Sequence, residues 1–315
     1  MPQRAPSAAS YTGSVPTRDD STPLSAEARD HVELAERVSA AARFDQPVRT
    51  RVFVVANQKG GVGKTTTTVN IAAALALKGL RVLVIDLDPQ GNASTALNIA
   101  HQEGMPGVYE AIVEGTDLDE LVKPCPEIDG LTVLPASIDL AGAEIELVSL
   151  VARESRLDRA LQSYLTDCED AGDRIDYVLI DCPPSLGLLT VNAMVAGREV
   201  LIPIQCEYYA LEGVGQLIRN IELVRSHLNP KLEITTILLT MYDARTRLSS
   251  GVADEVRSHF PDKVLRTAIP RSVRISEAPS YQQTVLTYDG SSSGALSYLE
   301  AAREIAAAGS QVAPR

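Results

Sequence analysis

Residues 52–66 read Val52-Phe53-Val54-Val55-Ala56-Asn57-Gln58-Lys59-Gly60-Gly61-Val62-Gly63-Lys64-Thr65-Thr66. An apolar run typical of a buried strand leads into a glycine-rich turn, and a helical pattern begins inside the motif. This order of elements favours a phosphate-binding loop, because the turn directs backbone N–H groups inward and the start of the helix adds positive potential. The motif predicts that Lys64 reaches the β- and γ-phosphates of a nucleotide and that the Thr65 hydroxyl is a ligand of Mg²⁺.

The loop departs in one respect from the usual pattern G-x-x-x-x-G-K-[ST]. Gln58 stands where that pattern has its first glycine, and a second lysine, Lys59, stands at the loop entrance. A glycine-rich turn between a strand and a helix can be purely structural. The phosphate-binding residue types are nevertheless present together, as Gly60, Gly61, Gly63, Lys64 and Thr65. In this context they favour a nucleotide site over a structural turn.

Outward from this stretch, short β-branched runs alternate with longer helical patterns, which predicts a parallel sheet with crossover helices. The expected strands are 52–56, 81–86, 131–135, 177–181, 199–204, 234–240 and 264–269. The expected helices are 64–78, 142–165, 187–196, 208–227, 249–260 and 293–308. The strand runs are apolar without alternation, as in strands covered on both faces. The predicted fold class is α/β, with a doubly wound, mostly parallel sheet of the P-loop NTPase type.

Acidic residues follow two further strands at the edge where the loop is expected. Asp86 and Asp88 end the second strand, and Asp181 ends the run Tyr177-Val178-Leu179-Ile180 in the form of a Walker B element. Ligands bind at this edge of open α/β sheets. We assign Asp88 the catalytic role of positioning the attacking water and leave Asp86 open, since one of the pair could merely cap the next segment. Asp181 is expected to contact Mg²⁺ through water.

These residues resemble the ParA/MinD group of deviant Walker A ATPases, whose hallmark is the extra lysine in K-G-G-x-G-K-[ST]. Beyond the loop, five segments look like chromosomal ParA/Soj proteins: Asp86-Leu87-Asp88-Pro89-Gln90-Gly91-Asn92, Leu140-Ala141-Gly142-Ala143-Glu144, Asp181-Cys182-Pro183-Pro184-Ser185, Gln205-Cys206-Glu207-Tyr208-Tyr209-Ala210-Leu211-Glu212-Gly213 and Ile269-Pro270-Arg271-Ser272-Val273-Arg274. The resemblance spans about residues 51 to 305 and implies an ATPase that drives chromosome or plasmid partitioning.

The resemblance also implies specific partners and residue roles. ATP and Mg²⁺ would be the cofactors, held by Lys59, Gly60, Gly61, Val62, Gly63, Lys64, Thr65 and Thr66, with Met241 and Pro270 at the adenine. Lys59 would cross an ATP-dependent homodimer interface to the partner's phosphates, Lys64 would act beside it, and Asp88 would be needed for hydrolysis. Arg245 would contact double-stranded DNA without regard to sequence, with Arg219, Arg271 and Arg274 as further candidates. A ParB-like centromere-binding protein would be the partner, and no membrane would be involved.

The charge distribution bears on the DNA hypothesis. The net charge of −12 disfavours a surface uniformly adapted to nucleic acid. From Val214 to Arg274, however, ten Lys and Arg stand against six Asp and Glu. The C-terminal third is therefore where an anionic partner would bind, although charge alone is also explained by a solvated surface.

Compartment and domain boundaries follow from composition. No apolar run approaches the roughly 20 residues that span a bilayer, and residues 1–16 lack the hydrophobic region of a signal peptide. Four widely spaced cysteines without a C-x-x-C pair (Cys125, Cys168, Cys182 and Cys206) are interpreted as reduced packing residues. A cytoplasmic, nucleoid-associated protein is expected.

The expected domains are a disordered tail (1–22), an amphipathic helix with linker (23–48), the ATPase domain (49–310) and a C-terminal tail (311–315).

Alternative functions are weighed against particular features. A MinD-like membrane-associated regulator of division-site placement needs a basic amphipathic C-terminal helix, whereas the segment from Arg303 to Arg315 is small and polar. A protein like the nitrogenase iron protein needs two cluster-bearing cysteines, and the N-K-x-D pattern of a GTPase is absent. A P-loop metabolite phosphotransferase shares the fold and stays open. About fifty residues before the ATPase domain are too few for a helix-turn-helix domain plus linker.

Overall fold

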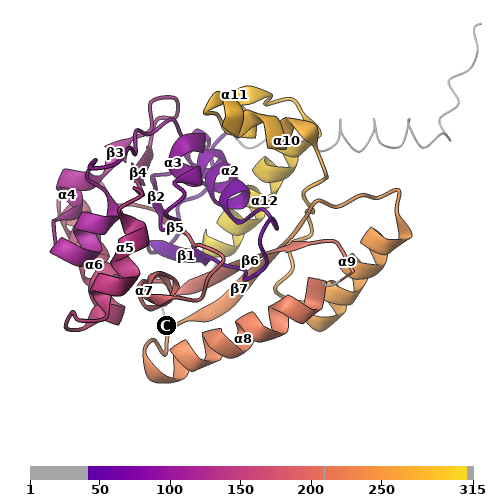
Figure 1. The fold of residues 1–315 in the computed structure, drawn as a ribbon. Helices are drawn as coiled ribbons and strands as arrows, with labels where there is room; N and C mark the ends of the chain where they lie inside the picture. The colour runs from indigo at the N-terminus through magenta and orange to yellow at the C-terminus, as the bar shows by residue number, and fades with distance from the viewer. Residues whose placement is uncertain (1–41, 209, 311–315) are drawn as a thin grey trace, which may run out of the picture.

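The computed structural model describes residues 42–208 and 210–310 (Figure 1). The tails expected at 1–22 and 311–315 lie outside these residues, as does 23–41 of the expected helix and linker.

A seven-stranded sheet with the order β3-β4-β2-β5-β1-β6-β7 forms the centre of the domain. Its strands are β1 (Arg51–Val55), β2 (Val82–Asp86), β3 (Lys123–Pro124), β4 (Leu131–Leu134), β5 (Tyr177–Asp181), β6 (Glu199–Gln205) and β7 (Glu233–Thr240). All neighbouring strands pair in parallel except the short β3, which is antiparallel to β4. The predicted doubly wound, mostly parallel sheet is confirmed, and β3 is an addition that the sequence pattern did not indicate.

Helices cover both faces of the sheet, which is why the strands are apolar at successive positions. The helical elements are α2 (Lys64–Leu77), α3 (Asn92–Ala96), η1 (Glu110–Glu114), α4 (Leu118–Leu121), α5 (Leu140–Leu147), η2 (Arg153–Ser155), α6 (Arg156–Asp170), α7 (Leu188–Ala196), α8 (Ala210–His227), α9 (Arg247–His259), α10 (Val273–Glu277), η3 (Ala278–Tyr281), α11 (Val285–Tyr288) and α12 (Ser293–Ser310). In β1, Val52 and Val54 join the core formed with α4 to α9, whereas Phe53 and Val55 join the core formed with α2, α3, α11 and α12.

The expected strand at 264–269 is wrong. This segment runs beside β7 but forms only an isolated bridge, between Ile237 and Val264. The backbone N–H groups of Arg266 and Thr267 donate instead to the carboxylate of Glu304 on α12, at 2.8 and 2.9 Å. Leu265 and Ile269 still donate to the β7 carbonyls of Ile237 and Leu239, at 2.9 and 2.8 Å, but the donors between them are taken by a side chain, so the pairing is interrupted and the segment remains irregular.

The single helix expected over 142–165 is also wrong. The structure has two helices here, α5 and α6, separated by turns from residue 148 to η2. Ala152 adopts a left-handed backbone conformation with φ of 53°, which interrupts the right-handed helical path. The apolar spacing continues across the break, so periodicity alone did not reveal it.

The sheet register brings the acidic strand ends together. Asp181 of β5 lies between Val55 of β1 and Asp86 of β2. All three strands are parallel, so their carboxyl ends meet at the edge from which the loop after β1 emerges. The fold thereby places the glycine-rich loop beside the two buried carboxylates.

Candidate nucleotide site

The glycine-rich loop after β1 turns sharply before α2 begins at Lys64. Gly61 and Gly63 have positive φ angles of 74° and 86°, a conformation that disfavours residues with a side chain. The carbonyl of Gly63 accepts a hydrogen bond from the Thr67 N–H at 2.8 Å, which begins the helical ladder. A Cβ atom on Gly60 or Gly61 would meet no atom within 4 Å, so this part of the loop borders open space. The geometry is that of a phosphate-binding loop.

Thr65 and Asp181, the two metal ligands that the sequence predicts, are in direct contact. The Thr65 hydroxyl donates to Asp181 Oδ2 at 2.7 Å, and the Thr68 hydroxyl is 3.1 Å from Asp181 Oδ1. A hydroxyl and a carboxylate at the base of a phosphate loop form the hard oxygen donor set that suits Mg²⁺. Among the described residues no group of three His, Cys, Asp or Glu could hold a metal alone. A magnesium ion at Thr65 and Asp181 therefore requires further oxygens from phosphates or water.

Burial sets the electrostatics of this site. Asp181 is fully buried, and desolvation together with the negative charges of Asp86 and Asp88 raises its pKa to about 8, against the lowering effect of the two threonine hydroxyls. Lys64 is also buried, and desolvation lowers its pKa although the charge of Asp181 opposes this. The lysine ammonium contacts only the Lys59 carbonyl, at 3.4 Å, among the hydrogen-bond acceptors of the described chain. A bound phosphate would stabilise the charged form of Lys64, and its cation would stabilise the ionised form of Asp181.

Asp86 and Asp88, which the sequence left partly unresolved, differ in environment. Asp86 is fully buried and accepts hydrogen bonds from the backbone N–H and the hydroxyl of Ser94, both at 2.8 Å. Desolvation raises its pKa to about 6 against these bonds. Asp86 therefore holds the start of α3, which is the capping alternative. Asp88 is half-buried and borders a cavity together with Lys64 and Thr65, where a water-positioning carboxylate would have to lie.

Two cavities meet at the loop. One, of about 420 Å³, is lined by the loop glycines, Lys64, Thr65 and Asp88. The other, of about 340 Å³, is lined by Met241 and Pro270, the residues expected at the adenine. The cavities share Gly63, Thr66, Met241 and Pro279. Met241 has a positive φ of 52°. The next residue, Tyr242, donates its N–H to the Ile269 carbonyl at 2.9 Å, and this bond holds Met241 beside Pro270. Together they offer one compartment for phosphates and one for a base.

The extra lysine of the loop lies at the rim and is paired within its own chain. Lys59 Nζ is 3.6 Å from Glu207 Oε2, and both side chains are well exposed, at 37% and 44%. The same carboxylate contacts the Arg271 guanidinium at 3.4 Å. Sequence reasoning did not assign a role to Glu207. The sequence does contain a signal for Glu207, because it is a further acidic residue just beyond the end of a strand, in the segment that begins at Gln205.

The four arginines expected at DNA do not form one cluster. Arg245 follows β7, is 80% exposed and has its guanidinium 2.9 Å from Asp243. Arg271 lies close enough for its charge to help lower the pKa of Asp243, after the larger effect of the hydrogen bonds from Arg245. Arg274 on α10 is paired with Glu277 and Asp289. Arg219 is exposed on α8, and no contact in the described chain joins it to the other three.

Glu144 packs against the loop that follows Asp181. A side chain at Gly187 would overlap the Glu144 carboxylate, whose Oε1 is buried and has no hydrogen-bond partner among the described residues. The segment Leu140-Ala141-Gly142-Ala143-Glu144 thus meets the segment that begins Asp181-Cys182-Pro183-Pro184-Ser185 in space. A larger residue at 187 would require the Glu144 carboxylate to move.

The raised pKa of Asp181 gives a testable pH dependence in the nucleotide-free protein. The folded state keeps a proton that the unfolded carboxyl, with a pKa near 3.9, releases. Stability should therefore fall as pH rises from about 4 to about 8, with a slope of up to about 1.4 kcal/mol per pH unit for this proton. Urea unfolding at pH 5, 6, 7 and 8 measures the slope. Asp181→Asn, which cannot titrate, should show a shallower decline, and equal slopes in both proteins would contradict the assignment.

Among the described residues, no helix combines the length and the apolar character that a membrane span requires.

The fold and the loop define the class of protein as a P-loop nucleotide-binding protein, and comparison with known proteins narrows it. The family described as an AAA domain matches residues 50–234. The chain is 51% identical over 259 residues to sporulation initiation inhibitor protein Soj of Bacillus subtilis, covering 82% of this chain and 99% of Soj. It is 52% identical over 256 residues to chromosome partitioning protein ParA of Caulobacter vibrioides, covering 81% and 93%.

A solved structure is also similar. It is described as cobyrinic acid a,c-diamide synthase from Mycobacterium smegmatis with bound ATP analogue and magnesium, with 40% identity, a TM-score of 0.69 and coverage of 81% of this chain and 94% of that one. Given its fold, its loop and these relatives, this chain belongs to the Soj/ParA family of chromosome-partitioning P-loop ATPases.

Proposed function

We propose that this chain binds ATP with Mg²⁺, pairs with a second copy, binds duplex DNA without regard to base sequence, and leaves the DNA when a ParB-like partner stimulates hydrolysis. The observation that carries the proposal is the pair of connected cavities at the loop, lined by Lys64, Thr65 and Asp88 on one side and by Met241 and Pro270 on the other. The magnesium and ATP analogue in the similar M. smegmatis structure support these cofactors.

The chemistry assigned to the chain's own residues follows from their positions. Lys64 and the loop N–H groups bind the phosphates, and Thr65 with Asp181 holds the cation directly or through water. Asp88 orients the water that attacks the terminal phosphate. Magnesium, when bound, neutralises charge on the phosphate oxygens, and its charge favours the ionised form of Asp181.

Lys59 supports the dimer step. Its ammonium lies at the rim of the site, and its contact with Glu207 is an exposed ion pair, which contributes only about 0–1 kcal/mol. Leaving Glu207 for the phosphates of a second copy therefore costs little. A lysine that arrives from the partner stabilises the charge of the transferring phosphate, as an arginine finger does in other phosphate-loop enzymes.

The DNA step rests on local charge. An acidic protein must attach through a basic patch, and pairing two copies doubles that patch, which can strengthen attachment by roughly 10²–10⁴-fold without new contacts. The attraction is electrostatic, so it should fall steeply with salt and be indifferent to sequence. ATP state and DNA residence are thereby coupled.

Arg245→Ala tests the leading DNA contact. We expect lower affinity for random-sequence duplex and a salt dependence (log affinity against log salt) that is shallower by about 0.9 for each phosphate that the variant no longer neutralises. ATP-driven dimerisation should be unchanged, because Arg245 does not line either cavity. Fluorescence anisotropy over a salt series measures both DNA quantities.

Two variants sharpen this test. Arg159→Ala removes an exposed arginine on α6 and is the matched control. Asp243→Asn removes the carboxylate that holds Arg245 and should strengthen DNA binding. If Arg245→Ala binds DNA like the unmodified protein, the contact must be sought at Arg219, Arg271 and Arg274.

The whole function is tested by duplex binding without nucleotide, with ADP and with ATP. A partitioning ATPase of this kind should bind only with ATP. A MinD-like membrane protein or a metabolite enzyme should give no ATP-dependent DNA signal, and that result would reject the proposal.

A further inference from the structure

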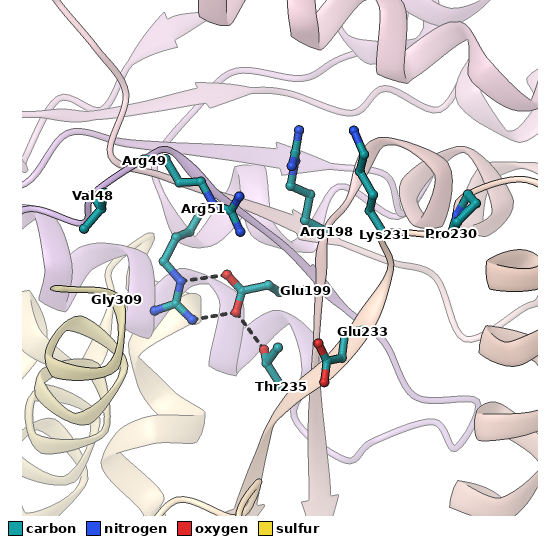
Figure 2. Close-up of a pocket in the computed structure, with 10 residues that line it drawn as sticks. All are labelled: Val48, Arg49, Arg51, Arg198, Glu199, Pro230, Lys231, Glu233, Thr235 and Gly309. Carbon is teal, nitrogen blue, oxygen red and sulfur yellow. Dashed lines mark hydrogen bonds and ion pairs between the residues drawn. The ribbon is translucent and has the colours of Figure 1, made fainter. Parts of the chain in front are cut away.

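A basic pocket lies at the sheet edge opposite the nucleotide cavities. It has a volume of about 630 Å³ and is lined by the first residues of three strands, Arg51 of β1, Glu199 of β6 and Glu233 of β7, with Arg49, Arg198 and Lys231 around them (Figure 2). A second cavity of about 380 Å³ shares Arg198 and Lys231 and continues the pocket towards Asp158. The two cavities form an elongated groove.

The floor of the pocket is electrostatically satisfied. Arg51 donates to both carboxylate oxygens of Glu199, at 2.7 and 2.5 Å, and to the Ile305 carbonyl at 2.7 Å. The Thr235 hydroxyl donates to Glu199 Oε2 at 2.8 Å. Glu233 is 3.8 Å from the ammonium of Lys263. Arg51 and the two carboxylates therefore have partners within the domain.

The three cations around this floor make no direct side-chain contact, although the charges of Arg198 and Lys231 act on Asp158 and oppose the desolvation that raises its pKa. Within the described ranges 42–208 and 210–310, no side-chain hydrogen bond or ion pair is made by Arg49, Arg198 or Lys231. Figure 2 shows the Arg198 and Lys231 side chains extending in the same direction, away from the Arg51–Glu199 pair, with Arg49 beside Arg51. In a chain with a net charge of −12, three unpaired cations at one pocket attract an anionic partner.

We propose that this pocket binds residues 19–36 of the same chain. That segment contains six carboxylates, from Asp19, Asp20, Glu27, Asp30, Glu33 and Glu36, against the single arginine Arg29, a net charge of −5. It precedes the matched family domain, which begins at residue 50. Its charge is opposite to that of the unpaired cations, so docking would neutralise them.

The chain between the acidic segment 19–36 and the pocket is long enough for the two to meet. Phe44 is buried and its N–H donates to the Lys78 carbonyl at 3.1 Å, which anchors the chain there. At about 3.5 Å per residue, residues 37–43 can span up to about 24 Å, while Phe44 and Arg49 can be at most about 17 Å apart. A segment tethered this closely has an effective concentration in the millimolar range, so weak ion pairs suffice.

Duplex DNA fits this pocket less well. Asp158 lies at one end of the groove, and Glu199 and Glu233 line its floor, so a continuous row of phosphates would meet carboxylates. A peptide carries its charges at separate positions and can avoid them. The bound segment would cover these cations and restrict DNA contact to the edge that carries Arg245.

Carbodiimide coupling of the full-length protein tests the proposal, because it joins a lysine amine to a carboxylate only at ion-pair distance. Peptide mass spectrometry should find Lys231 joined to carboxylates of 19–36 but not Lys123 on β3. The yield should fall in about 0.5 M salt, where the Debye length is only about 4 Å. Coupling a mixture of unlabelled and ¹⁵N-labelled protein separates links within one chain from links between two chains.

Two variants make the test specific. Arg49→Glu/Arg198→Glu retains the reactive Lys231 and should lower the yield about tenfold, whereas Arg225→Glu/Arg247→Glu, a matched double reversal of exposed arginines on α8 and α9, should not. Neutralising the six acidic residues of 19–36 to Asn and Gln should abolish these links and leaves the ATPase domain unchanged. Equal melting temperatures would show that each variant is folded.

Three results would overturn the proposal. The first is that Lys231 couples to residues 19–36 no more often than Lys123 does. The second is that every link joins two chains, which would make a second copy the occupant. The third is that the unmodified protein forms no Lys231 link while Arg49→Glu/Arg198→Glu weakens duplex binding, which would make the pocket a nucleic-acid contact.

Discussion

Lys64→Ala is expected to abolish ATP binding at micromolar nucleotide concentrations. Lys64 is a buried cation whose pKa is lowered by desolvation, and its ammonium contacts only the Lys59 carbonyl among the hydrogen-bond acceptors described. It is therefore held ready for an anion that the isolated domain does not supply. Removing one partner of a buried charge pair costs about 2–5 kcal/mol, which corresponds to a loss of affinity of roughly 30- to several-thousand-fold.

Isothermal titration calorimetry with ATP and Mg²⁺ measures this loss. Lys123→Ala removes the same charge from β3 at the far edge of the sheet and should bind ATP normally. The Lys64→Ala protein should remain folded, because the substitution removes a desolvated cation rather than a packed apolar group. Unchanged nucleotide affinity in Lys64→Ala would reject the phosphate-loop assignment.

Asp88→Ala is expected to bind ATP but to hydrolyse it at least about 100-fold more slowly, since binding depends on the loop and hydrolysis on an organised water. Asp88 is half-buried at the cavity that Lys64 and Thr65 also line. Because the ATP-bound form would no longer be consumed, a dimer should accumulate. Phosphate release measures the rate, and light scattering with ATP measures the mass.

Two comparisons separate this role from a structural one. Asp129→Ala removes an exposed carboxylate before β4 and should hydrolyse ATP at the normal rate. Asp86→Asn should mainly lower stability, because Asp86 holds Ser94 at the start of α3. If Asp88→Ala stays monomeric with ATP or retains normal hydrolysis, its assignment as the water-positioning residue is wrong.

Much of the fold could be predicted from local sequence. The loop after β1 was predicted, and six of the seven expected strands are present in the structure. The reason is that a strand covered on both faces needs a continuous apolar run, and a phosphate loop needs glycines directly before a helix. Where prediction failed, a distant side chain or a local backbone reversal decided the structure. Glu304 took the backbone donors of Arg266 and Thr267 in the expected strand 264–269, and Ala152 interrupted the helix expected over 142–165.

The candidate site divides in the same way. Sequence alone identified Lys64, Thr65, Asp88 and Asp181 as candidates, because the chemistry of phosphate binding restricts which residue types follow particular strands. Only the tertiary structure distinguished Asp86 from Asp88, through the hydrogen bonds of Ser94. It alone paired Lys59 with Glu207, and it alone joined the first residues of β1, β6 and β7 in a basic pocket. The physical reason is that local backbone preference is recorded in neighbouring residues, whereas contacts between side chains separated in the sequence depend on loop conformation, strand order and register, which short-range patterns do not specify.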